Sequence, residues 1–135
     1  MSDDNPSVIG HISIGTNDFA RASAFYREVL ATLGCKELHA FPGGVAFGKV
    51  FPEIWIQTPI DGQPASVGNG VHFAFLARDR AQVDAFYEAA IARGAVDEGA
   101  PGARPQYGPQ YYGCFVRDLD GHKIEATHWD SEAGH

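Results

Sequence analysis

Two histidines and one glutamate stand in this sequence where a folded chain can bring imidazole and carboxylate groups together. His11, His72 and Glu125 each lie in a short segment that alternates polar and apolar residues. Two imidazoles and one carboxylate form the facial arrangement that holds Fe(II), with positions left open for substrate, water or dioxygen. Manganese, zinc and nickel accept the same donors. The set therefore predicts one divalent ion of unspecified identity.

A bound ion of this kind acts as a Lewis acid, since it polarises a chelating oxygen and stabilises the negative charge that develops on it. A lone strand histidine is more often a structural residue. What favours the metal is that two histidines occupy the same place in an internal repeat, with a carboxylate facing them. The competing interpretation is a metal-free pocket in which the same three residues bind polar groups of a ligand.

The repeat has a constant offset. His11 and His72 are 61 residues apart, and the same spacing separates Asp18 from Asp79, Phe25 from Phe86 and Tyr26 from Tyr87. Gly34 and Gly94 close the two copies. Since each copy carries the same order of signals, the two copies predict two similar folding units in one chain.

Each copy predicts a strand, a helix and three further strands. An aspartate can cap each helix at its N-terminus, and a glycine ends it. The expected strands are 8–15, 35–41, 45–50 and 53–58, then 70–77, 95–99, 110–117 and 122–129, with the last two joined by a tight turn at 118–121. The prediction is an α+β fold of two βαβββ repeats, about 8–58 and 70–129, within a single domain 1–135. The linker 59–69 allows both copies to pack within one chain or to exchange between two chains.

Strand alternation decides which residues share a face with the three metal donors. Isoleucines and phenylalanines take the helix side, so the polar and aromatic residues between them take the other. A concave wall with convergent polar groups is the default binding site. The residues expected there as substrate contacts are Ser13, Trp55, Gln57, Tyr111, Phe115 and Arg117; no catalytic residue is assigned. Arg117 or Arg104 could meet an anionic group of the substrate.

These residues resemble the vicinal oxygen chelate superfamily, which contains glyoxalases, bleomycin-resistance proteins and extradiol dioxygenases. The resemblance rests on His11 with the Asp18 helix start, on Gly70-Val71-His72, and on the closing segment 116–125, where only Leu119 replaces the usual proline. It implies a cupped eight-stranded mixed sheet with a metal at its centre, ligated by His11, His72 and Glu125. Members of this length are commonly homodimers, so we expect one here.

The resemblance also implies a difference from glyoxalase I. In that enzyme a fourth ligand, a glutamate, lies on the fourth strand, where this chain has Trp55. The three-ligand pattern is closer to extradiol dioxygenases and fosfomycin-resistance thiol transferases. We expect a metalloenzyme that acts on a small oxygen-chelating substrate by lyase, isomerase, dioxygenase or thiol-transfer chemistry. The alternative is a metal-free protein that sequesters a small molecule, as bleomycin-resistance proteins do.

Composition excludes other classes of partner. The net charge of −7 disfavours nucleic acid, which is bound through clustered lysine and arginine. No apolar run approaches the roughly 18 residues of a membrane span, and the start of the chain does not resemble a secretory signal, so we expect a cytoplasmic protein with a small-molecule partner. Cys35 and Cys114 are far apart and predict small core residues rather than a disulfide.

Overall fold

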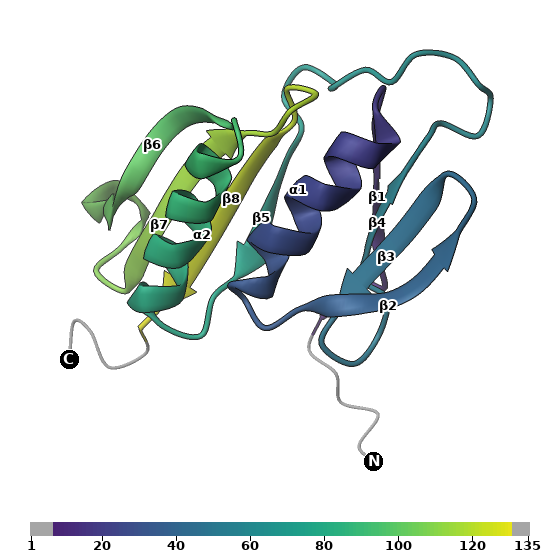
Figure 1. The fold of residues 1–135 in the computed structure, drawn as a ribbon. Coiled ribbons are helices and arrows are strands. Elements are labelled where there is room, and N and C mark those ends of the chain that lie inside the picture. Colours follow the sequence, from purple (N-terminus) through teal and green to yellow (C-terminus); the bar gives the residue numbers. More distant parts are fainter. Residues whose placement is uncertain (1–6, 131–135) are drawn as a thin grey trace.

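The computed structural model describes residues 7–130 and contains two βαβββ units in succession (Figure 1). The first unit consists of β1 (Ile12–Gly15), α1 (Phe19–Ala31), β2 (Lys36–Phe41), β3 (Gly44–Gly48) and β4 (Ile54–Gln57). The second consists of β5 (His72–Leu76), α2 (Arg80–Ala92), β6 (Val96–Ala103), a 3-10 turn (Pro105–Tyr107), β7 (Tyr111–Arg117) and β8 (Lys123–Trp129). The predicted element order is confirmed.

Two boundaries differ from those expected from the sequence. The strand predicted over 8–15 begins only at Ile12, so His11 lies just before β1. The strand predicted over 95–99 continues to Ala103, because irregular pairing with β7 carries it past Gly99. Gly99, Pro101 and Gly102 lie within this strand, because bulges in an edge strand accommodate glycine and proline.

The eight strands lie in two hydrogen-bonded sheets of four. Their orders are β1-β4-β3-β2 and β5-β8-β7-β6. The pairs β1–β4 and β5–β8 are parallel, and all other neighbouring strands are antiparallel. Within residues 7–130 no strand ladder joins the two sheets, so the eight strands expected in one cupped sheet are divided equally between the repeats.

The capping residues found in the sequence begin both helices. A side-chain oxygen of Asp18 accepts the amide hydrogen of Arg21, and Asp79 does the same for Gln82. Each accepts one of the amides that a helix start leaves unpaired. The chain leaves each helix through a glycine with positive φ, 85° at Gly34 and 101° at Gly94, which confirms the predicted stop signals.

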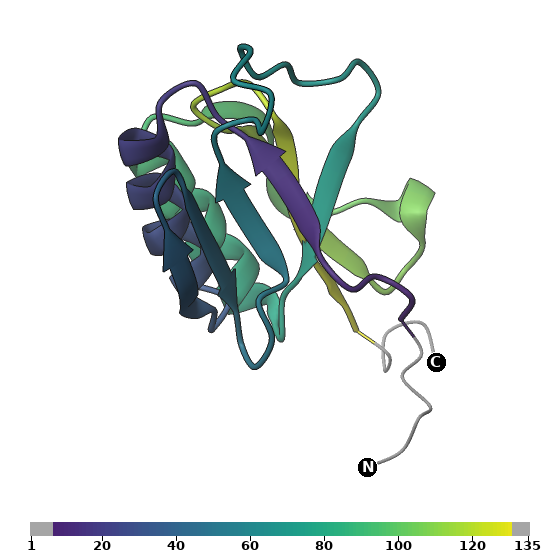
Figure 2. The ribbon, with the colours of Figure 1, turned by 90° about the vertical axis from the view of Figure 1, so that its right-hand side faces the viewer.

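Both helices lie on the same side of the molecule, with the strands on the other side (Figure 2). Helix α1 packs on β2, β3 and β4, helix α2 packs on β6, β7 and β8, and the helices contact each other. The buried residues form one core that spans both units, including Val29, Leu30, Ile56, Val83 and Phe86. Each helix therefore covers one face of its own sheet and leaves the opposite face free of helix contacts.

The closing hairpin of the second unit is fastened to the first unit. The hydroxyl of Tyr26 on α1 donates to Asp118 Oδ2 at 2.5 Å, and His122 Nε2 lies 2.7 Å from the carbonyl oxygen of Gly15. Gly121 has a φ of 97°, as the predicted turn requires. These contacts fix the orientation of one unit against the other. No helix among residues 7–130 is long and apolar enough to cross a membrane.

Candidate functional site

His72 and Glu125 meet on the face of the second sheet that its helix does not cover. Strands β5 and β8 run in parallel, with Ala74 paired to Glu125, and this register places His72 Nε2 3.2 Å from Glu125 Oε1. Glu125 is 6% exposed, whereas His72 is exposed. Two donors that each lie about 2.1 Å from one ion, at a right angle, are about 3 Å apart. The 3.2 Å contact is a hydrogen-bond distance, and it also matches the spacing of two neighbouring ligands.

Tyr111 holds the other oxygen of this carboxylate. Its hydroxyl donates to Glu125 Oε2 at 2.7 Å, and its ring lies against Tyr107 and Trp129, with centroids 5.0 and 5.2 Å apart. Burial, and next the hydrogen bond to Glu125, raise the pKa of Tyr111 well above its ordinary value, so the hydroxyl keeps its proton and remains a donor. The sequence predicts Tyr111 as a substrate contact. In the structure its side chain is 2% exposed, and its hydroxyl is hydrogen-bonded to Glu125.

His11, the residue that precedes β1, lies among aromatic rings. Its centroid is 6.0 Å from that of Trp55, which is in turn 5.7 Å from His39 and 6.1 Å from Phe41. His39, which is not among the residues predicted for the site, belongs to this group. The small residue Ala46 on β3 pairs with both His39 and Trp55, so the two rings meet above it. His39 and Phe41 are two residues apart on one strand, so strand alternation alone predicts that both side chains lie on the same face.

Trp55 and Glu125 occupy equivalent positions in the two units. Trp55 pairs with Ser13 across β4 and β1, while Glu125 pairs with Ala74 across β8 and β5. Ser13 and Ala74 are 61 residues apart, which is the offset of the repeat. The assignment of Trp55 to the slot of a carboxylate ligand is therefore consistent with the register of the strands.

Within residues 7–130 of one chain, no three histidine, cysteine, aspartate or glutamate side chains gather as a metal site requires. The three predicted donors are divided between two groups, which we call half-sites. The first half-site is defined by His11, His39, Phe41 and Trp55. The second is defined by His72, Tyr111, Phe115 and Glu125. The sequence left open whether one chain or two supply the donors, and a single chain does not bring them together.

The remaining expected contacts lie on the predicted faces. Ser13 is exposed and Gln57 is half-buried, both on the side of Trp55. Phe115 pairs with Glu125 and packs against His72, with ring centroids 6.3 Å apart. Lys123, which alternation places on the same face of β8 as Glu125, has its amino nitrogen 5.0 Å from the Phe115 ring. It lines a cavity of about 470 Å³ together with the segment 67–71.

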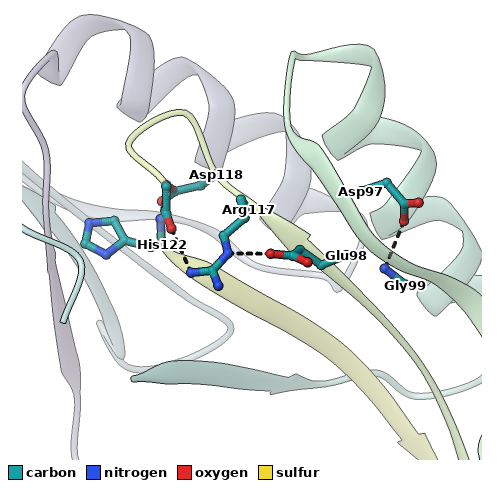
Figure 3. A network of polar contacts seen from close by, with 7 residues as sticks. Asp97, Glu98, Gly99, Arg117, Asp118 and His122 are labelled. Atoms are coloured by element: carbon teal, nitrogen blue, oxygen red, sulfur yellow. Dashed lines mark hydrogen bonds and ion pairs between the residues drawn. The ribbon is translucent and has the colours of Figure 1, made fainter. Parts of the chain in front are cut away.

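The two arginines proposed for anion binding already have partners in the protein. Arg117 pairs with Glu98 at 2.7 Å, as Figure 3 shows. Arg117 also donates to the carbonyl oxygen of Gly121. Arg104 donates to the carbonyl oxygens of Ala100, Gly102 and Gly113 and covers the ring of Phe115. Arg104 therefore links the end of β6 to β7 beside Phe115 of the second half-site.

Both cysteines are free thiols. Cys114 is buried, as expected, and burial raises its pKa to about 11. Cys35 is half-buried against the same core, and burial raises its pKa too. Neither thiol resembles the electropositive, low-pKa environment of a reactive cysteine.

This architecture, with its repeated βαβββ unit and paired strand residues, defines a known class. The family model of the Glyoxalase/Bleomycin resistance protein/Dioxygenase superfamily matches residues 8–126. The chain belongs to this superfamily.

Solved structures agree with this assignment. A glyoxalase/bleomycin resistance protein from Albidiferax ferrireducens T118 is 37% identical, with a TM-score of 0.81 over 90% of this chain and 98% of the other. A lactoylglutathione lyase from Agrobacterium tumefaciens is 26% identical, with a TM-score of 0.65 over 91% and 94%. A family enzyme from Burkholderia phytofirmans PsJN, 18% identical with a TM-score of 0.68 over 91% and 99%, shares the fold. No curated protein sequence matches the chain significantly.

Proposed function

We propose that this protein is a metalloenzyme of the glyoxalase superfamily in which His11 of one chain and His72 and Glu125 of a second chain bind one divalent ion. The observation that carries the proposal is the contact between His72 and Glu125, 3.2 Å apart on paired strands. Iron, manganese, zinc and nickel all suit two imidazoles and one carboxylate. The substrate is a small molecule that offers two neighbouring oxygens.

Two copies are needed because each half-site supplies only part of the donor set. The first half-site has two imidazoles, of which His11 is the proposed ligand, but no carboxylate, since Trp55 stands where the second unit has Glu125. Its face exposes His11, His39 and Phe41, the last at 41%. Aromatic groups exposed together on a sheet face are typical of an interaction surface. A homodimer that stacks the first half-site of one chain on the second half-site of the other completes two identical sites.

The chain's own residues suit small-molecule chemistry. A bound ion supplies Lewis-acid polarisation of the substrate oxygens. Trp55 and Phe115 form apolar walls that limit access of water, and Lys123 offers a positive charge at the edge of the second half-site. The lyase named among the similar structures has 26% identity to this chain, and lactoylglutathione lyase chemistry is one candidate reaction. Trp55 disfavours it, since this chain lacks the glutamate that is the fourth metal ligand of glyoxalase I.

Mixed dimers test the proposal directly. The variants His11→Ala and His72→Ala should each lose most of the metal. When they are unfolded together, refolded and separated by tag, the heterodimer should regain one ion per dimer, because one of its two sites has all three donors intact. Heterodimers without metal would refute a site shared between chains. If the wild-type protein stays metal-free with Fe(II), Mn(II), Zn(II) and Ni(II) supplied in turn, the metal-free binding protein becomes the better account.

A further inference from the structure

We propose that Tyr111 is a positioning residue for the metal ligand Glu125, reserving Oε2 so that only Oε1 is free to bind an ion. This inference rests on the proposed function, since it assigns a role to a residue behind the proposed ligand. Its consequence concerns the substrate. A glutamate that binds through one oxygen leaves one more coordination position open than a glutamate that binds through both.

The two oxygens of Glu125 face different partners. Oε1 lies 3.2 Å from His72 Nε2, and Oε2 accepts the Tyr111 hydroxyl hydrogen at 2.7 Å. The carboxylate is 6% exposed, so water has little access to either oxygen. Ligating carboxylates are commonly oriented by such outer hydrogen bonds, which tune the affinity for the ion. The arrangement directs one oxygen toward the other proposed ligand and occupies the second.

The hydroxyl of Tyr111 reaches Glu125 through space that a glycine leaves free. A β-carbon added at Gly113 would lie 2.2 Å from the Tyr111 hydroxyl oxygen and 2.9 Å from the carbonyl oxygen of Ala126. Tyr111 therefore lies along β7 over Gly113, and its ring is held by Tyr107 and Trp129. A side chain fixed on both sides loses little further freedom when it holds a partner, which is what orienting a ligand requires.

An exclusively structural role is the competing explanation, because a buried tyrosine usually finds some acceptor. Tyr112, the next residue, offers a matched control. Its hydroxyl donates to Asp84 at 2.6 Å, so Tyr112→Phe removes the same type of hydrogen bond from the opposite face of the same strand. A structural role predicts that Tyr111→Phe and Tyr112→Phe both lower stability and leave the metal centre unchanged.

The test uses Co(II) in the full-length dimer, with the visible absorption of the bound ion as the measurement. Tyr111→Phe should change the Co(II) spectrum, weaken Co(II) binding by about 10–100-fold, and weaken acetohydroxamate, a two-oxygen chelator, more than azide, which needs one position. Tyr112→Phe should match the wild type in all three. A wild-type spectrum and wild-type chelator binding in Tyr111→Phe would overturn the proposal.

A second measurement applies if Tyr111→Phe fails to fold. Infrared difference spectra of wild-type protein with isotope-labelled glutamate, with and without the ion, report whether the ligating carboxylate uses one oxygen or two. One oxygen is expected, and a two-oxygen signature would overturn the role of Tyr111. Absence of any ion from the wild-type protein would instead refute the proposed function, and this inference with it.

Discussion

Trp55 and Glu125 lie at the same position of the two repeats, each paired with a small residue on the neighbouring parallel strand, Ser13 and Ala74 respectively. The first repeat therefore presents an indole where the second presents a carboxylate. In the proposed dimer, this substitution removes a fourth protein ligand and replaces it with an apolar wall.

Substitutions of Trp55 should distinguish a residue that contacts the substrate from a residue that binds the metal. Trp55→Ala is expected to keep the metal content and to weaken substrate binding, because an indole contact is lost and no donor is. Trp55→Glu should bind the metal more tightly, because it adds a fourth donor to the set. Elemental analysis and metal titration of both variants measure this. Loss of metal in the alanine variant would mean that Trp55 supports the site in another way.

Removing a proposed donor should empty the site, and a nearby histidine provides the control. His72→Ala and Glu125→Gln are each expected to lose most of the bound ion, since two remaining donors compete poorly with water for a divalent cation. His128→Ala removes an imidazole of β8 that belongs to neither half-site, so its metal content should equal that of the wild type. Equal loss in all three variants would point to a general loss of folding.

The contact between Tyr26 and Asp118 should stabilise the packing of the two repeats. Tyr26→Phe leaves Asp118 Oδ2 without this donor in a buried position, although Oδ1 still accepts the amides of Asp120 and His122. The free energy of unfolding in urea should fall by about 1–3 kcal/mol. Tyr107→Phe, at a tyrosine that is 51% exposed, should change it by less than about 0.5 kcal/mol. Equal effects would contradict the role assigned to the Asp118 contact.

The buried thiol of Cys114 should make stability fall at alkaline pH. Burial raises the pKa of Cys114 from 9.0 to about 11, so the folded chain resists an ionisation that the unfolded chain undergoes. The contribution is complete below pH 9 and is lost as the pH rises toward 11. Compared with Cys114→Ala, the wild type should lose about 2 kcal/mol more between pH 8 and 10.5. A pH-independent difference between the two proteins would show that the thiol does not titrate in this way.

Local signals in the sequence determined the order of the elements. Asp18 and Asp79 cap their helices, Gly34 and Gly94 end them, and the offset of 61 residues correctly predicted two βαβββ units. Strand alternation also predicted the faces of Trp55 and Glu125, because the period of two depends only on the backbone. Such properties are encoded within a few neighbouring residues, so one sequence suffices to find them.

Tertiary structure decided how the two repeats stand relative to each other, and therefore which donors meet. Among the described residues the strands pair within each repeat and not between them, so Glu125 lies beside His72 and does not form a group with both histidines. The proposed role of Tyr111 likewise depends on the space above Gly113 and on the rings of Tyr107 and Trp129 that hold its side chain. Contacts between distant segments arise from packing of the whole core, and no periodicity in the sequence specifies them.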